Sequence, residues 1–480
     1  MRVPHALRVV VLLAALALPA AAVAQSLATM PLTTQSQEAM TALRAGVTDA
    51  TMLYPAGAVR HYRAALEKDP GFALARAFRA HDDPTLTTEQ RRAESDRALA
   101  DAVRATTAEM TLVMMLREDV YGRGNGAQAM RRAMKALVPE ESSYWAADLA
   151  PTTTPKEAAA RWREATAKFP EQALPLNAYA YALWAVGDHK GALDAARRQV
   201  ERWGKTPNPH DSYAELLAWS GDLSGAEQHY RHAIEMTPDF SEAYAGLAEV
   251  AIMRGDAARA RTELERALQH TDDPALRIDY TRQMAGTYAL EANREKTREQ
   301  LKKAAELAAA QSDTVAMGLL DAQMAPLASH DGNADAAHAL VARATTLRPN
   351  AVGVLYFTAM AHAILGHEAP ARAALAKARA QPAGKTAPAM HRLTAAEGYI
   401  HIKGERPRPA LALLQKADTT DLVVLSWIAE ANRMLGSTTR ANAQFARVRD
   451  NREVDLTDLA EVVARQRART ALAPRAADRD

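Results

Sequence analysis

The stretch SGDLSGAEQHYRHAIEMTP, residues 220–238, belongs to a pattern that recurs along the chain. Its Gly221-Asp222 dipeptide has counterparts at Gly187-Asp188 and Gly255-Asp256, so that 34 residues separate each glycine from the next. The small residue that follows the dipeptide keeps the same spacing, at Ala192, Ala226 and Ala260. A fixed period of this length indicates a solenoid in which one small unit repeats.

Each unit has residues suited to a helix-turn-helix. Gly221 ends the first helix, because glycine readily adopts the positive φ that such an ending needs. Ala226 is small and lets the second helix approach the first closely. Tyr230 and Ala233 continue the apolar face at helical spacing. Pro238 stops the second helix and turns the chain toward the next unit.

This arrangement resembles the tetratricopeptide repeat, a helix-turn-helix of 34 residues. The second-helix spacing recurs at residues 57–70, 158–170 and 336–349, and further glycines at Gly332 and Gly366 are again 34 residues apart. Between Gly255 and Gly332 the chain is longer than two periods, which places extra residues near 269–276 and 308–315. The last two units lie around Gly404 and Gly436.

The resemblance implies an all-α fold, a right-handed α-α superhelix of about twelve helix pairs over residues 37–451. One such unit cannot bury its own apolar face, so stacked units share one continuous core rather than forming separate globular domains. Residues 452–470 are expected to form a solvated capping helix, and residues 471–480 a disordered tail.

Residues 1–24 read as a secretory signal peptide. Arg2 and Arg8 precede an apolar run over residues 9–18, and small residues lie before a cleavage site after Ala24. An uncleaved membrane anchor is the alternative, but the run is shorter than a spanning helix requires. With residues 25–36 as a linker, we expect a periplasmic or secreted protein and no membrane span after cleavage.

Composition excludes several kinds of function. The chain has no cysteine, which rules out disulfides, thiol catalysis and cysteine-based zinc sites. Lysine and arginine number 59 against 57 acidic residues, without a concentrated basic block, so nucleic acid is not an expected partner. The glycine-rich residues 121–129 lack the strand and the lysine of a phosphate-binding loop. No catalytic motif stands out, and neither an enzyme nor a cofactor is expected.

His229 and His232 could mark a metal-binding helix. Two histidines three residues apart can share one ion, but a catalytic zinc needs a third ligand, and Glu235 is the only nearby candidate. The pair falls beside the packing positions Tyr230 and Ala233, toward the outer face of the second helix. A solvated outer face explains it better than a metal site.

The resemblance also implies a binding surface. In tetratricopeptide arrays, positions 2, 5, 9 and 12 of the first helices line the inner, concave face and contact peptides. The first positions are taken as Ala173, Pro207, Ser241 and Ile278. The predicted groove residues are then Asn177, Tyr181, Trp184, Asp211, Glu215, Glu242, Glu249 and Asp279. Farther on, the same positions give a less charged set, Tyr356, Met360, His391 and His401.

This predicted groove favours a basic or amine-bearing extended peptide. Its carboxylates would steer and pair with cations, and the two aromatic side chains would anchor the peptide. The alternative is that the carboxylates form a solvated face and the aromatic side chains pack between units.

The favoured function is therefore an exported scaffold or adaptor that binds a protein or peptide in its groove, with self-association left open. One alternative is a structural component of a cell-envelope or secretion assembly that acts through its convex face or its ends. A hydrolase with an unrecognised site is a less favoured third.

Overall fold

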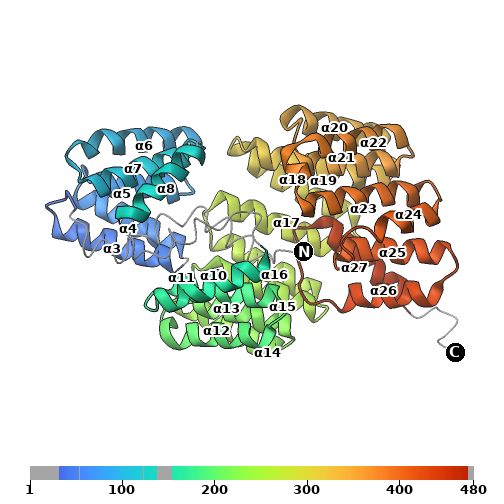
Figure 1. The fold of residues 1–480 in the computed structure, drawn as a ribbon, viewed down its shortest axis with the longest axis horizontal. Coiled ribbons are helices and arrows are strands. Elements are labelled where there is room, and N and C mark those ends of the chain that lie inside the picture. The colour runs from blue at the N-terminus through green and yellow to red at the C-terminus, as the bar shows by residue number, and fades with distance from the viewer. Residues whose placement is uncertain (1–31, 53, 123, 138–153, 474–480) are drawn as a thin grey trace. The chain divides into compact units, whose positions relative to one another are not determined.

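The computed structural model describes residues 32–52, 54–122, 124–137 and 154–473. These residues form 24 α-helices and two short 3₁₀-helices, and no strand occurs among them (Figure 1). The predicted signal peptide, most of the predicted linker and residues 474–480 lie outside the described residues. Of the described helices, none has the length and apolar character needed to cross a bilayer.

The helices form two compact units. The N-terminal array comprises residues up to Val250 together with His270–Asp273, and the C-terminal array comprises Ala251–Gln269 and the residues from Pro274 onward. The N-terminal array holds α3 (Gln37–Thr51), α4 (Pro55–Lys68), α5 (Ala73–Asp82), α6 (Thr88–Asp101), α7 (Thr107–Val120), α8 (Gly124–Leu137), α10 (Pro155–Lys168), α11 (Ala173–Ala185), α12 (His189–Trp203), α13 (Pro207–Ser220), α14 (Leu223–Met236) and most of α15 (Ser241–Met253).

The C-terminal array continues the same alternation of first and second helices. It holds α16 (Ala257–Gln269), α17 (Pro274–Leu290), α18 (Arg294–Ala310), α19 (Thr314–His330), α20 (Ala334–Leu347), α21 (Val352–Ile364), α22 (Glu368–Ala380), α23 (Ala387–Lys403), α24 (Pro407–Leu414), α25 (Leu422–Met434), α26 (Thr438–Asp450) and α27 (Leu459–Leu472).

The packing positions read from the sequence are buried. In the quoted unit, Ala226 and Ala233 are fully buried and Tyr230 is 2% exposed. The ring of Tyr230 packs against Gly246 of α15, where an added Cβ would come within 2.2 Å of the ring. Small residues therefore allow the two helices of neighbouring pairs to approach closely.

The Gly-Asp dipeptide links the two helices of a pair with both of its residues. Gly221 has a φ of 101°, and the Asp222 N–H donates to the Leu217 carbonyl at 2.9 Å, which closes the end of α13. The Asp222 carboxylate then accepts from the Gly225 N–H at 2.9 Å and caps α14. The dipeptide therefore ends one helix and begins the next.

Three of the described residues other than glycine take the left-handed conformation, among them Ser312 between α18 and α19 at a φ of 54°. The turn between α17 and α18 places Ala292 in the left-handed region at a φ of 59°. After α23, Glu405 takes the left-handed conformation at a φ of 58°, while Gly404 has a φ of −86°. The extra residues before Gly332 lengthen α17, α18 and α19 to 17 residues each.

The prediction that the helix within residues 452–470 is solvated is wrong. α27 runs from Leu459 to Leu472, and Val462 and Ala468 are fully buried. Even Glu461 and Arg465 are 3% and 5% exposed, and they pair with each other at 2.8 Å. The helix therefore belongs to the core of the C-terminal array.

Candidate functional site

The predicted register of the first helices holds for three of the four units used. α11, α13 and α15 begin at Ala173, Pro207 and Ser241, as expected. α17 begins at Pro274, four residues before Ile278, because this helix is longer than its counterparts. We call the surface formed by the first helices of the pairs the first-helix face.

Three predicted groove residues are packed between helices instead of facing a ligand. Asn177, Tyr181 and Trp184 are 1%, 2% and 5% exposed. Asn177 donates to Gln199 at 3.2 Å and to Ser212 at 2.8 Å, and so joins three successive helices.

The two aromatic side chains likewise hold the array together. The Tyr181 hydroxyl donates to Glu215 at 2.6 Å, and the rings of Tyr181 and Trp184 lie 6.2 Å and 5.6 Å from that of Trp219. The prediction that Tyr181 and Trp184 anchor a peptide is wrong in this conformation, because their surfaces are already used in packing.

The carboxylates of the N-terminal array are brought together by α13 and α15. Burial raises the pKa of Asp211 well above its ordinary value, and the charges of Glu215, Glu242 and Glu249 raise it further. These four partly buried side chains therefore share one electrostatic environment. Each ionisation makes the next one less favourable, and a cation placed among them would reverse that effect.

Glu242 is a partly buried member of this cluster. Burial raises its pKa to about 7, although the Ser241 hydroxyl, 3.2 Å from the carboxylate, favours the charged form. Asp273 and Asp239 add a smaller rise. The negative charge of this surface therefore increases between mildly acidic and mildly basic pH.

Asp279 does not belong to the same unit as the other predicted groove residues. It lies on α17 of the C-terminal array, where Gln283 donates to it at 3.0 Å and Arg282 lies 3.5 Å away. The remaining predicted positions also diverge. His401 contacts the Arg372 guanidinium at 3.2 Å, and His391 is exposed.

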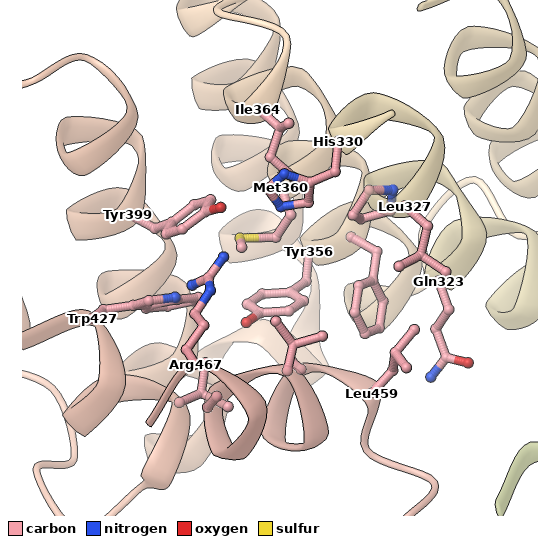
Figure 2. A pocket seen from close by; sticks show the side chains of 16 residues that line it. Gln323, Leu327, His330, Tyr356, Met360, Ile364, Tyr399, Trp427, Leu459 and Arg467 are labelled. Carbon is pink, nitrogen blue, oxygen red and sulfur yellow. The ribbon is translucent and has the colours of Figure 1, made fainter. Parts of the chain in front are cut away.

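The first-helix face of the C-terminal array contains an apolar pocket (Figure 2). Tyr356 and Met360, which the sequence placed on this face, contribute to its wall. The lining comprises Gln323, Pro326, Leu327, His330, Tyr356, Phe357, Met360, Ile364, Tyr399, Val423, Trp427, Leu459, Ala460, Val463, Ala464 and Arg467. Four first helices supply one side, and α27 supplies the other.

Arg467 gives the pocket a charged group (Figure 2). Burial opposes its charge, but Tyr399 and Glu430, whose carboxylate lies 3.5 Å away, outweigh that effect and raise the pKa of Arg467. Burial, aided by cations that include Lys403 and Arg467, lowers the pKa of His330 to about 4. At neutral pH the pocket therefore combines apolar walls, a neutral imidazole and one guanidinium that is already paired.

The chain before α27 lies directly against α17. The Leu456 carbonyl approaches Gly286 so closely that a Cβ there would lie 2.2 Å from the oxygen, and Arg282 donates to the Thr457 carbonyl at 3.1 Å. Sequence reasoning missed this contact. The apolar spacing of Leu459, Val462 and Val463 was a usable signal, since it predicts a helix with one buried face.

Comparison with known families supports the repeat assignment. The tetratricopeptide-repeat family model matches residues 217–278, from the last turn of α13 to the start of α17. The same alternation of helices continues on both sides of that segment within the described residues. Residues 217–278 therefore match the tetratricopeptide-repeat family, and the described residues have an all-α solenoid fold.

Two solved structures illustrate the similarity. YrrB, described as a tetratricopeptide-repeat protein with an unusual peptide-binding site, is 21% identical, with a TM-score of 0.27 over 39% of this chain and 92% of its own. Yeast Tom70 is 15% identical, with a TM-score of 0.41 over 90% of this chain and 95% of its own. A search of curated proteins gives no match.

Proposed function

We propose that this protein is an exported, non-catalytic scaffold that binds a protein through an extended basic segment at the acidic first-helix face of α13 and α15. The observation that carries this proposal is the grouping of Asp211, Glu215, Glu242 and Glu249. Their mutual repulsion is relieved when a lysine or arginine side chain enters among them.

This proposed site differs from the groove predicted from the sequence, in which two aromatic side chains anchor the peptide. Tyr181 and Trp184 are internal supports, so binding depends on charge and on the positions that the helices give to the carboxylates. Partly buried ion pairs are screened less by salt than exposed ones, and they contribute to specificity and to the association rate.

The test uses a fluorescein-labelled peptide of alternating lysine and glycine, followed by fluorescence anisotropy with the full chain. The double variant Glu215→Gln, Glu249→Gln removes two charges, and the amide introduced by Glu215→Gln still offers an oxygen to the Tyr181 hydroxyl. We expect at least ten-fold weaker binding in this variant. Added salt should weaken binding to the parent.

The matched control is Glu164→Gln with Glu235→Gln. These two residues are exposed on the second helices α10 and α14, so the change in net charge is the same at a different place. The control should bind like the parent. Equal losses in both double variants, or no loss in the first, would refute this site.

Export is the second part of the proposal, and it is supported by the amino-acid pattern of residues 1–24. Expression of the full chain in a bacterium, followed by fractionation and N-terminal sequencing, tests it. We expect a chain that begins at Gln25 in the periplasmic fraction. A chain that begins at Met1 and stays in the cytoplasm would contradict export but would leave the acidic binding site open.

A further inference from the structure

Three histidines of the C-terminal array converge at the turn between α21 and α22. His338 lies on α20, His362 on α21, and His367 at the N-cap of α22. One ring nitrogen from each lies within 4.8 Å of the others. The ring centroids form a nearly equilateral triangle, with separations of 5.5, 5.8 and 5.9 Å.

From this geometry we propose that His338, His362 and His367 bind one divalent transition-metal ion of the Zn²⁺, Ni²⁺ or Cu²⁺ class, with a coordination position left for water or another ligand. Imidazole is a preferred ligand of these ions. The site would connect two successive helix pairs, α19–α20 and α21–α22.

The required rearrangement is small. Three imidazole nitrogens bound to Zn²⁺ at about 2.0–2.1 Å in tetrahedral geometry lie about 3.4 Å from one another. The present nitrogens, within 4.8 Å of one another, need to approach by no more than about 1.4 Å. His338 and His367 are exposed, so rotation of these side chains does not require the core to move.

His362 is half-buried, whereas the other two histidines of the cluster are exposed. The His362 Nδ1 is buried without a hydrogen-bond partner. Buried polar atoms are almost always satisfied, so this nitrogen calls for an explanation that coordination would supply.

The position of His367 adds an independent observation. At the equivalent turns, Asp222 and Asn333 accept a backbone N–H with their side chains and so cap the next helix. His367 occupies the N-cap of α22 but makes no such bond. The fold also keeps this side chain near His362, because the His367 N–H donates to the His362 carbonyl at 2.8 Å.

A second histidine cluster, in the N-terminal array, differs because a histidine at its centre has hydrogen-bond partners for both ring nitrogens. There His210 joins the predicted pair His229 and His232. His210 Nε2 contacts the Gly204 carbonyl at 3.0 Å and its Nδ1 contacts His229 Nδ1 at 2.9 Å. Because both of its nitrogens are engaged in hydrogen bonds, we assign no metal site to this cluster.

The experiment uses the full chain, purified without a histidine tag and freed of metal with a chelator. ZnCl₂ is titrated by calorimetry, and Co²⁺ is followed by its visible absorption. We expect one high-affinity ion per chain in the parent. The variant His338→Ala, His367→Ala changes two exposed side chains and should bind Zn²⁺ at least ten-fold more weakly, without loss of helical circular dichroism.

The matched control is His229→Ala with His232→Ala in the second cluster. It should retain the parent affinity, and His362→Gln should lose it like the first variant. Failure of the parent to bind Zn²⁺ would overturn the proposal. So would equal weakening in the control, or unchanged binding in the His338 and His367 variant.

Discussion

The two arrays use the same helix pair to present different first-helix faces. In the N-terminal array, α13 and α15 gather Asp211, Glu215, Glu242 and Glu249. In the C-terminal array, the first helices from α19 to α25 present an aromatic and aliphatic pocket whose other wall is the chain's own α27. The first-helix face of the N-terminal array is therefore acidic, whereas that of the C-terminal array is apolar and covered by α27.

The difference shows which positions of the repeat are constrained. Alanines such as Ala226 and Ala344 are fully buried in both arrays, because the helices cannot approach one another around larger side chains. First-helix positions that are not packed between helices, unlike Asn177 and Tyr181, can become acidic in one array and apolar in the other. An apolar face requires cover from water, and α27 provides it.

Removal of α27 should have the largest effect. A chain that ends at Asn451 exposes the pocket wall and loses the buried side chains Leu456, Leu459 and Val462. Each such side chain contributes about 1.5–3 kcal/mol when fully buried, so we expect the C-terminal array to lose about 5 kcal/mol or more. Hydrogen exchange of peptides from α19, α21 and α25, with binding of a hydrophobic dye, measures the change.

The control for this truncation is a chain that ends at Ala473, which keeps all of α27. It should match the parent in exchange and in dye binding. Unchanged exchange in the shorter chain would show that α27 does not stabilise the array. The proposed contrast between a charged face and a covered face would then be wrong.

A single methyl group tests the covering contact more locally. In Gly286→Ala the new Cβ would lie 2.2 Å from the Leu456 carbonyl, so the segment before α27 has to shift. Such overpacking costs about 1–3 kcal/mol. Chemical denaturation followed by circular dichroism should show the C-terminal array unfolding at a lower denaturant concentration.

Gly353→Ala is the matched control, because it makes the same change in another first helix. There the new Cβ would lie 3.6 Å from Leu319, an ordinary contact, and alanine favours the helix by about 1 kcal/mol relative to glycine. The two variants should therefore shift stability in opposite directions. A stabilising effect of Gly286→Ala would mean that Leu456 does not hold this position in solution.

The period of the sequence was sufficient to predict the solenoid, glycine turns such as the one at Gly221, and the start of three first helices. It was insufficient to predict where the helix after the repeats docks, because that docking is a non-local contact, although the spacing of Leu459, Val462 and Val463 does indicate a buried face. Tyr181 was misassigned because an aromatic side chain suits a groove and a core equally. His338, His362 and His367 come from three helical segments, so their convergence also depends on the fold.

The smallest expected effect is the loss of stability caused by ionisation of the partly buried Glu242 carboxyl on the acidic face. Because the pKa of Glu242 is raised to about 7 in the folded protein, this carboxyl binds more protons there than in the unfolded chain between pH 4.5 and 7. Stability therefore falls as the pH rises through that window. Glu242→Gln should remove the cost and stabilise the N-terminal array by about 1 kcal/mol at pH 8, less than the full pKa shift would give because solvent screens this partly exposed side chain, with little gain at pH 4. Glu235→Gln changes an exposed residue on α14 and is the control. It should show no such dependence when both variants are compared by denaturation at the two pH values.

Glu242→Gln could instead destabilise the array equally at both pH values. The carboxylate would then act mainly as the acceptor for Ser241, and the acidic face would be a packing feature rather than a surface kept for a cationic partner.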